Sequence, residues 1–153
     1  MIHGQSTGET AKIRYGLFPM SFNGCEVISV FNALEYLGKQ KPLGEVVKYM
    51  RRFAVLFGLF GCNVYSIGKA LKHFGVESRR CDINSAGDTF ILSSWTGTPF
   101  LSSIHTVFCV RENGRIKVYN RFNSCTCEKF YDSPEKIFEN CRVIAIYELR
   151  IMN

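Results

Sequence analysis

Apolar residues in the first half of the chain recur at the three- and four-residue spacing that is typical of helices. The first run begins at Cys25 and ends before Gly38, a residue type that commonly follows a helix. Its apolar positions share one helical face, namely Val27, Val30, Phe31, Leu34 and Leu37. The spacing predicts a helix over residues 25–37, with the cysteine at or near its N-terminus.

Two further helical patterns follow the first one. Pro42 opens the second at a position that suits proline, and Gly58 and Gly61 interrupt the chain after it. Asn63 is a good N-cap for the third, and Gly75 ends it. The apolar stripes are Val46, Val47, Met50, Phe53 and Ala54 in the second helix, and Val64, Ile67, Leu71 and Phe74 in the third.

Beyond Gly75 the pattern changes to that of β-strands. Asn113-Gly114 separates two of them and is a strong short-range signal for a hairpin with a two-residue turn. The pattern of residues 85–97 is ambiguous and allows a short helix over residues 88–95. The expected strands cover residues 76–81, 99–104, 105–111, 115–120 and 142–151.

Helices followed by an antiparallel sheet predict an α+β fold, with N-terminal helices packed on a C-terminal antiparallel β-sheet. A short helix begins at Ser133-Pro134, before the last strand. The length of 153 residues fits a single domain. We assign residues 13–153 to this domain and expect the polar residues 1–12 to form a flexible N-terminal arm.

The composition fits a cytoplasmic globular protein, with 46% hydrophobic and 14% aromatic residues. The chain begins without the basic and apolar regions of a signal peptide. Its most apolar stretch, residues 53–60, is far shorter than the roughly 20 residues of a membrane span. The seven cysteines are an odd number, so reduced thiols are the simplest interpretation. We expect no membrane association.

The net charge of +6 raises the question of nucleic-acid binding. The basic residues occur in small pairs such as Arg79-Arg80, without a sustained run or a recognition motif, so a solvated basic surface is the preferred interpretation. Cys125 and Cys127 are spaced as CxC and not as the CxxC pairs of structural zinc sites. We expect no metal site and no cofactor.

Cys25 is the first candidate for a catalytic residue. The unpaired N–H groups and the positive end of the dipole at a helix N-terminus favour a thiolate there, which turns a weak nucleophile into a strong one. The alternative is a buried cysteine without a chemical role, because free cysteine is among the most buried residue types. A histidine and an asparagine further along the chain favour the chemical interpretation.

The predicted hairpin places His105 and Asn120 together. A two-residue turn at residues 113–114 makes them diagonal neighbours on one face, with Asn120 opposite Val107. We expect this face to pack on the first helix, which brings His105 to Cys25. The other members of the face are Val107, Cys109, Ile116, Val118 and Phe122.

Cys25, His105 and Asn120 can act as a nucleophile, a general base and a group that orients the imidazole. Asn123 is a rival for the third role if a bulge shifts the register. A hydrogen-bonded polar pair at a sheet edge is the alternative interpretation of His105 and Asn120.

The order of these motifs resembles that of the C39-like papain-fold cysteine peptidases, which include the leader-cleaving domains of bacteriocin exporters. In that family a cysteine opens a helix after a polar-Gly approach, a Gly-led apolar segment follows, a histidine begins an apolar strand, and the third catalytic residue ends the next strand. The matching stretches here are Asn23-Gly24-Cys25, residues 61–71, residues 105–110, and Val118-Tyr119-Asn120. The resemblance covers residues 15–150 and implies a papain-like cysteine proteinase fold with Cys25, His105 and Asn120 as its triad.

The sequence departs from that family at positions that concern the site. Asn120 stands where the family usually has Asp, and Glu26 stands where it usually has Gly, although a carboxylate disfavours a neighbouring thiolate. The family's oxyanion-hole Gln lies several residues before the cysteine, but no Gln occurs here between Gln5 and Cys25. Asn23, together with the backbone N–H of Cys25, is our candidate for the oxyanion hole.

We therefore expect a cysteine peptidase, or a related thiol acyl-transfer enzyme, that acts on a peptide or small amide substrate. Hydrolysis and acyl transfer to an amine use the same chemistry. The alternative is a catalytically degenerate papain-fold module that binds a peptide without turnover. A nucleic-acid-binding protein would instead show an affinity that falls steeply with salt.

Overall fold

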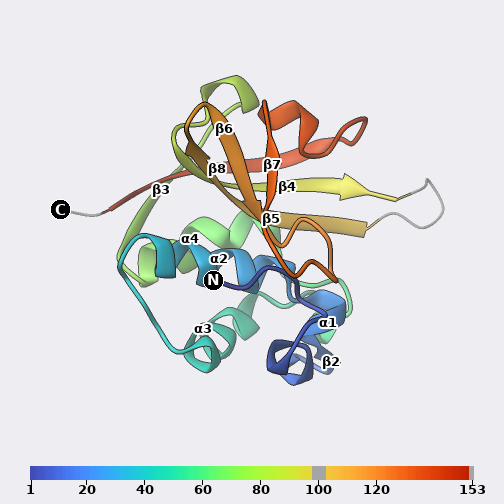
Figure 1. Cartoon of the computed structure of the whole chain (residues 1–153). Coiled ribbons are helices and arrows are strands. Elements are labelled where there is room, and N and C mark those ends of the chain that lie inside the picture. The colour runs from blue at the N-terminus through green and yellow to red at the C-terminus, as the bar shows by residue number, and fades with distance from the viewer. Residues whose placement is uncertain (98–102, 152–153) are drawn as a thin grey trace.

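The computed structural model describes residues 1–97 and 103–151, in which helices of the first half pack against a six-stranded antiparallel sheet (Figure 1). The helices are α1 (Met20–Asn23), α2 (Cys25–Tyr36), α3 (Leu43–Met50) and α4 (Ile67–His73). The sheet contains, in spatial order, β3 (Val76–Arg80), β8 (Val143–Ile151), β4 (Thr89–Thr96), β5 (Ser103–Glu112), β6 (Arg115–Tyr119) and β7 (Lys129–Tyr131). The short strands β1 (Arg14–Tyr15) and β2 (Phe18–Pro19) pair with each other. The predicted α+β class is confirmed.

The helices begin and end close to where the apolar pattern predicted. α2 begins at Cys25, and Gly38 follows it with a φ of 70°, which glycine adopts without strain. α3 begins directly after Pro42. The side-chain oxygen of Asn63 accepts the N–H of Tyr65 at 3.0 Å and so caps the turn that leads into α4. In the described part of the chain, no helix has the length and apolarity needed to cross a membrane.

The stretch over residues 88–95, for which the pattern allowed a short helix, lies in strand β4, so that interpretation is wrong. β4 lies in the interior of the sheet between β8 and β5, and Phe90, Ile91 and Leu92 are all buried. A strand that is covered on both faces carries a continuous apolar run and loses the alternation that identifies a strand. Of the strand expected over residues 99–104, the first four residues lie outside the described residues and the last two begin β5.

Both faces of the sheet are covered, and α2 packs on the face opposite to the expected one. The hydroxyl of Ser29 donates to the backbone carbonyl of Thr106 at 3.1 Å, and the rings of Tyr36 and Phe108 are 5.8 Å apart. Thr106 fits beneath the helix because its hydroxyl pairs with that of Ser93 at 2.9 Å. The face expected beneath α2 lies instead in a second apolar core, which contains Val107, Cys109, Ile116, Val118, Ile137 and Phe138.

The predicted hairpin is confirmed at its turn and differs at its far end. Glu112 pairs with Arg115, and Asn113 and Gly114 both have positive φ, as a type I′ turn requires. Pairing ends at Tyr119, so the predicted pairing of Asn120 with Val107 is wrong. Asn120 leaves the strand with a φ of 60°, which asparagine tolerates better than most residues.

The segment expected to be a loose arm is held against α2 and the end of the hairpin. The side chain of Asn32 in α2 accepts the N–H of Ile2 at 2.7 Å and donates to the carbonyl of the same residue at 2.8 Å. The N–H of Ser6 donates to the carbonyl of Asn123 at 2.7 Å. These hydrogen bonds join the segment to the buried Asn32 and to the end of the hairpin, which its own composition does not reveal.

Candidate active site

Cys25 and His105 line one pocket of about 400 Å³, which we call the Cys25 pocket. α2 presents Cys25 from its first turn, and β5 presents His105 from near its beginning. The structure thus brings Cys25 and His105 to the same pocket. The remaining lining residues are Gln5, Phe22, Thr96, Ser103, Ile104, Arg121, Phe122 and Asn123.

The thiol of Cys25 is buried, and its partners are not the expected ones. Its Sγ lies 3.3 Å from Oε2 of Glu26 and 3.8 Å from the backbone carbonyl oxygen of Ile104, so two acceptors are within reach of its single proton. Burial, and then the charge of Glu26, raise the pKa of the Cys25 thiol well above its ordinary value. The resting cysteine is therefore a neutral thiol, because desolvation outweighs the helix dipole that was expected to favour a thiolate.

Glu26 is the buried carboxyl group of the site. Burial raises the pKa of Glu26 to about 7, although hydrogen bonds from backbone N–H groups and from the Cys25 thiol oppose the shift. A Cβ on Gly61 would lie only 3.1 Å from Oε2 of Glu26, so a larger residue there would crowd the carboxyl group. Glu26 therefore titrates near neutrality, directly beside the candidate nucleophile.

His105 is held by the backbone of Asn120. Its Nε2 lies 2.6 Å from the carbonyl oxygen of Asn120, and a carbonyl only accepts, so Nε2 carries the proton and Nδ1 is the basic nitrogen. Burial, and then the nearby charge of Arg121, lower the pKa of His105 to about 4. The ring of Phe138 packs edge-on against the imidazole at 6.0 Å. His105 is thus a neutral, oriented base.

Asn120 contacts His105 through its backbone carbonyl and not through the side chain that was expected to orient the imidazole. The buried side chain points to the N-terminal segment, where Oδ1 accepts the backbone N–H of Gln5 at 3.0 Å and Nδ2 donates to Oε1 of Gln5 at 3.3 Å. The rival candidate Asn123 lines the same pocket, and its carbonyl accepts the N–H of Ser6. Asn120 therefore connects the imidazole to the N-terminal segment.

Asn23, the candidate for the oxyanion hole, does not line the Cys25 pocket. Its Nδ2 donates to the carbonyl of Tyr15 at 3.0 Å and also to that of Gly58. The amide N–H groups thus donate to the end of β1 and to the segment between α3 and α4. In this position Asn23 has a structural role, because its hydrogen bonds hold the chain segment that precedes Cys25.

Gln5 is the pocket residue that sequence reasoning missed. It is 2% exposed, and its Nε2 donates to the carbonyl of Ser21 at 3.1 Å, which leaves the second N–H of this amide available. The spacing of Gln5 from Cys25 gave no signal, because Gln5 enters the pocket only when the N-terminal segment docks. A glutamine amide in the pocket of a candidate nucleophile is the type of donor that an oxyanion hole uses.

Within residues 1–97 and 103–151, no group of three or more His, Cys, Asp or Glu side chains is arranged to hold a metal ion. The seven cysteines of the chain all lie in these residues, and all are unpaired thiols. The chemistry that the pocket offers from its own side chains is thiol and imidazole chemistry.

No protein-family model matches this sequence, and no curated protein matches it. The fold is similar to that of a crystal structure of a double glycine motif protease from an AMS/PCAT transporter in complex with the leader peptide, with a TM-score of 0.55. The two sequences are 16% identical over 84% of each chain. This likeness shows a shared fold, in which helices cover a large antiparallel sheet.

Proposed function

We propose that this chain is a C39-like, papain-fold cysteine peptidase, or a related thiol acyl-transfer enzyme, that acts on a peptide or small amide substrate. The observation that carries the proposal is the pocket that Cys25 and His105 share, in a fold similar to that of a protease. The unpaired cysteines support a reducing compartment, and we place the protein in the cytoplasm.

In the proposed reaction, Nδ1 of His105 accepts the thiol proton while Sγ of Cys25 attacks the substrate carbonyl. The new C–S bond leaves a negative charge on the carbonyl oxygen. The backbone N–H of Cys25 and the second N–H of the Gln5 amide are the proposed donors to that oxygen. When the C–N bond breaks, the imidazolium returns its proton to the leaving amine, and water or another amine then releases the thioester.

This reaction requires a movement at the site. The resting thiol is hydrogen-bonded to Glu26 and Ile104 and not to the imidazole of His105, so its proton has other acceptors before substrate binds. Hydrogen bonds of catalytic groups are often long or misaligned without substrate and form only in the complex. We propose that a substrate carbonyl in the pocket shifts the thiol proton from Glu26 towards His105.

The test is cleavage of a synthetic peptide. The similar protease is named for a double glycine motif and was crystallised with a leader peptide, so a leader-like peptide with an internal Gly-Gly is the first substrate to try. We expect a product detected by mass spectrometry that Cys25→Ser abolishes. His105→Gln, which keeps an N–H for the Asn120 carbonyl, should slow cleavage by about a hundredfold or more. Cleavage that persists in Cys25→Ser would refute the proposal.

A second candidate function is a peptide-binding module without turnover. The observation that favours it is the neutral thiol beside a buried carboxylate, with no imidazole hydrogen-bonded to it. On this alternative the same peptide binds the Cys25 pocket and is recovered intact. Competition between the peptide and alkylation of Cys25, without any cleaved product, would identify this outcome.

A further inference from the structure

A second pocket of about 460 Å³ lies at the β3 edge of the sheet and shares no lining residue with the Cys25 pocket. We call it the β3 groove. Its charged side chains come from α4, β3 and β8, and cations outnumber carboxylates among them. The charged residues are Lys72, Glu77, Arg79, Arg80, Glu148 and Arg150.

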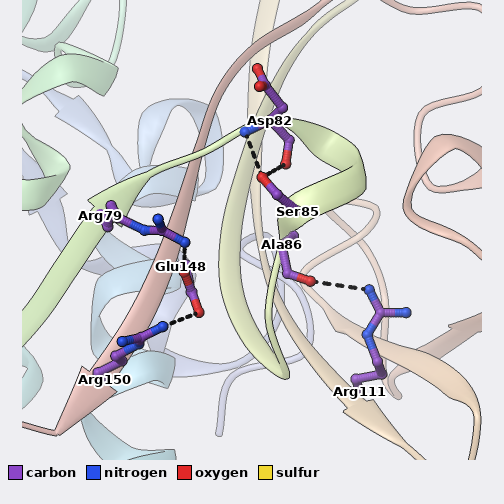
Figure 2. A network of polar contacts seen from close by, with 7 residues as sticks. All are labelled: Arg79, Asp82, Ser85, Ala86, Arg111, Glu148 and Arg150. Carbon is purple, nitrogen blue, oxygen red and sulfur yellow. Dashed lines mark hydrogen bonds and ion pairs between the residues drawn. The ribbon is translucent and has the colours of Figure 1, made fainter.

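Two arginines in the β3 groove are held by one carboxylate. Arg79 donates to Oε2 of Glu148 at 2.8 Å, and Arg150 donates to Oε1 of Glu148 at 3.1 Å, each from a single nitrogen. Figure 2 shows both arginines reaching this one carboxylate. The two arginine side chains are 69% exposed, whereas that of Glu148 is 11% exposed. A Cβ on Gly87 would lie 2.7 Å from Oε1 of Glu148, so the chain closes over the carboxyl group. The cluster therefore keeps a surplus positive charge and presents most of its N–H donors to solvent.

The same groove runs along an open sheet edge. Among the described strands, β3 pairs with β8 alone, so half of its backbone N–H and C=O groups point away from the sheet. Side chains alternate along β3, which places Arg79 with Glu148 and Arg150 on one face and Arg80 on the other, over the ring of Tyr65 at 4.9 Å. Cations thus flank both sides of the free edge.

We propose that the β3 groove binds an acidic, extended peptide segment of a partner protein, which adds to the sheet as a strand beside β3. The free edge supplies backbone hydrogen bonds, and the cations on its two sides supply charge complementarity for carboxylates on both faces of the added segment. Nucleic acid fits the β3 groove less well, because the positive charge extends only along the length of one strand and two carboxylates also line the groove. The proposal is independent of any reaction at Cys25.

The test is fluorescence anisotropy with the full chain and a fluorescein-labelled peptide rich in Glu and Val. The matched controls are the same peptide with every Glu replaced by Gln, and the acidic peptide N-methylated at alternate residues, which blocks strand pairing. We expect saturable binding of the acidic peptide that weakens with salt. Both control peptides should bind at least about tenfold more weakly.

Variants locate the binding site. Arg80→Glu should weaken binding of the acidic peptide by about tenfold, and Lys72→Glu should weaken it in the same direction. Arg115→Glu makes the same change of charge on β6, outside the groove, and should leave the affinity within about twofold. Slowed amide hydrogen exchange in β3 on binding would confirm the strand pairing.

Several results would overturn the proposal. They are the absence of saturable binding up to about 1 mM peptide, equal effects of Arg80→Glu and Arg115→Glu, and equal binding of the N-methylated peptide. Tighter binding of a single-stranded RNA of the same charge, lost in Arg80→Glu, would assign the groove to nucleic acid and reject the peptide.

Discussion

Glu26 is the residue that sets the resting state of Cys25. Its carboxyl group is buried, accepts the thiol proton at 3.3 Å, and adds to desolvation in raising the pKa of Cys25. A thiolate formed beside an ionised Glu26 would place two negative charges in one buried site. The site is therefore reactive only when the thiol proton has another acceptor or when Glu26 is neutral.

The first prediction concerns Glu26→Gln. This variant keeps an oxygen that can accept the thiol proton but removes the charge, so the pKa of Cys25 should fall. We expect alkylation of Cys25 by iodoacetamide at pH 8 to become about tenfold faster, which corresponds to one pKa unit. The measurement is the rate at each cysteine, mapped by mass spectrometry, with the buried Cys109 as internal control. An unchanged or slower rate at Cys25 would show that Glu26 does not control the thiol.

The second prediction separates the two roles of Asn120. Asn120→Gly keeps the carbonyl that holds His105 and the positive φ, but removes the side chain that holds Gln5. Cleavage should slow by about tenfold to a hundredfold in kcat, while the pH dependence that reports His105 stays in place. Asn120→Ala loses the same hydrogen bonds and is strained at this φ, so it should be less stable than the Gly variant by about 1 kcal/mol. Equal kcat in wild type and Asn120→Gly would exclude the proposed role of Gln5.

At the scale of elements, the docked N-terminal segment completes the pocket. It brings Gln5 into the Cys25 pocket and is hydrogen-bonded to Asn32 of α2 and to Asn120 at the end of the hairpin. An element that contributes a polar group to a site must be ordered when the site acts. On the proposed function, we therefore propose that the segment belongs to the working site.

The third prediction tests this docking by native-state hydrogen exchange. The backbone N–H groups of Ile2, Gln5 and Ser6 donate to Asn32, Asn120 and Asn123. We expect their exchange to be slowed by at least about a hundredfold against a free peptide. Asn120→Gly should release Gln5 and leave Ile2 protected. If all these amides exchange at the free-peptide rate, the segment is the flexible arm that its composition suggested.

Elements that depend on local signals could be predicted from the sequence. The hairpin turn at Asn113-Gly114 and the beginning of α2 at Cys25 follow from a few adjacent residues, and both agree with the structure. β4 could not be identified, because burial on both faces removed its alternation. The place of Gln5 in the Cys25 pocket could not be predicted either, because it depends on tertiary docking that no local pattern encodes.

At the scale of the whole molecule, the sheet separates two cores and positions the site at one end of β5. The face with Val107 and Cys109 was expected beneath α2 because it is the more apolar one, yet α2 covers the face with Thr106 and Phe108. Because both faces of this sheet are covered and therefore apolar, the hydrophobicity of a face does not predict which of the two packs against the helices. His105 still reaches the Cys25 pocket because it lies near the beginning of its strand.

The fourth prediction concerns stability against pH. The pKa of Glu26 is raised to about 7 in the folded chain, so the folded state favours the protonated carboxyl group. Stability is therefore full below about pH 4.5 and is lost as the pH rises towards 7, by up to about 3 kcal/mol from this group. His105, whose pKa is lowered to about 4, acts in the opposite sense, since it costs stability as the pH falls below about 6.5.

Urea unfolding of wild type and Glu26→Gln between pH 5 and pH 8 isolates the Glu26 contribution, because that of His105 is common to both. As the pH rises, the free energy of unfolding of the wild type should fall relative to that of the variant. A difference between the two free energies that stays constant across this range would mean that Glu26 is ionised in the folded chain throughout.

The most direct test of the central claim, that Cys25 and His105 act as one reactive unit, is covalent trapping by a Gly-Gly peptide vinyl sulfone. Its addition to the thiol needs both a nucleophilic sulfur and a proton donor. We predict a single adduct at Cys25, formed about a hundredfold more slowly in His105→Gln. An adduct spread over several cysteines, or one that forms at Cys25 equally fast in His105→Gln, would contradict the account.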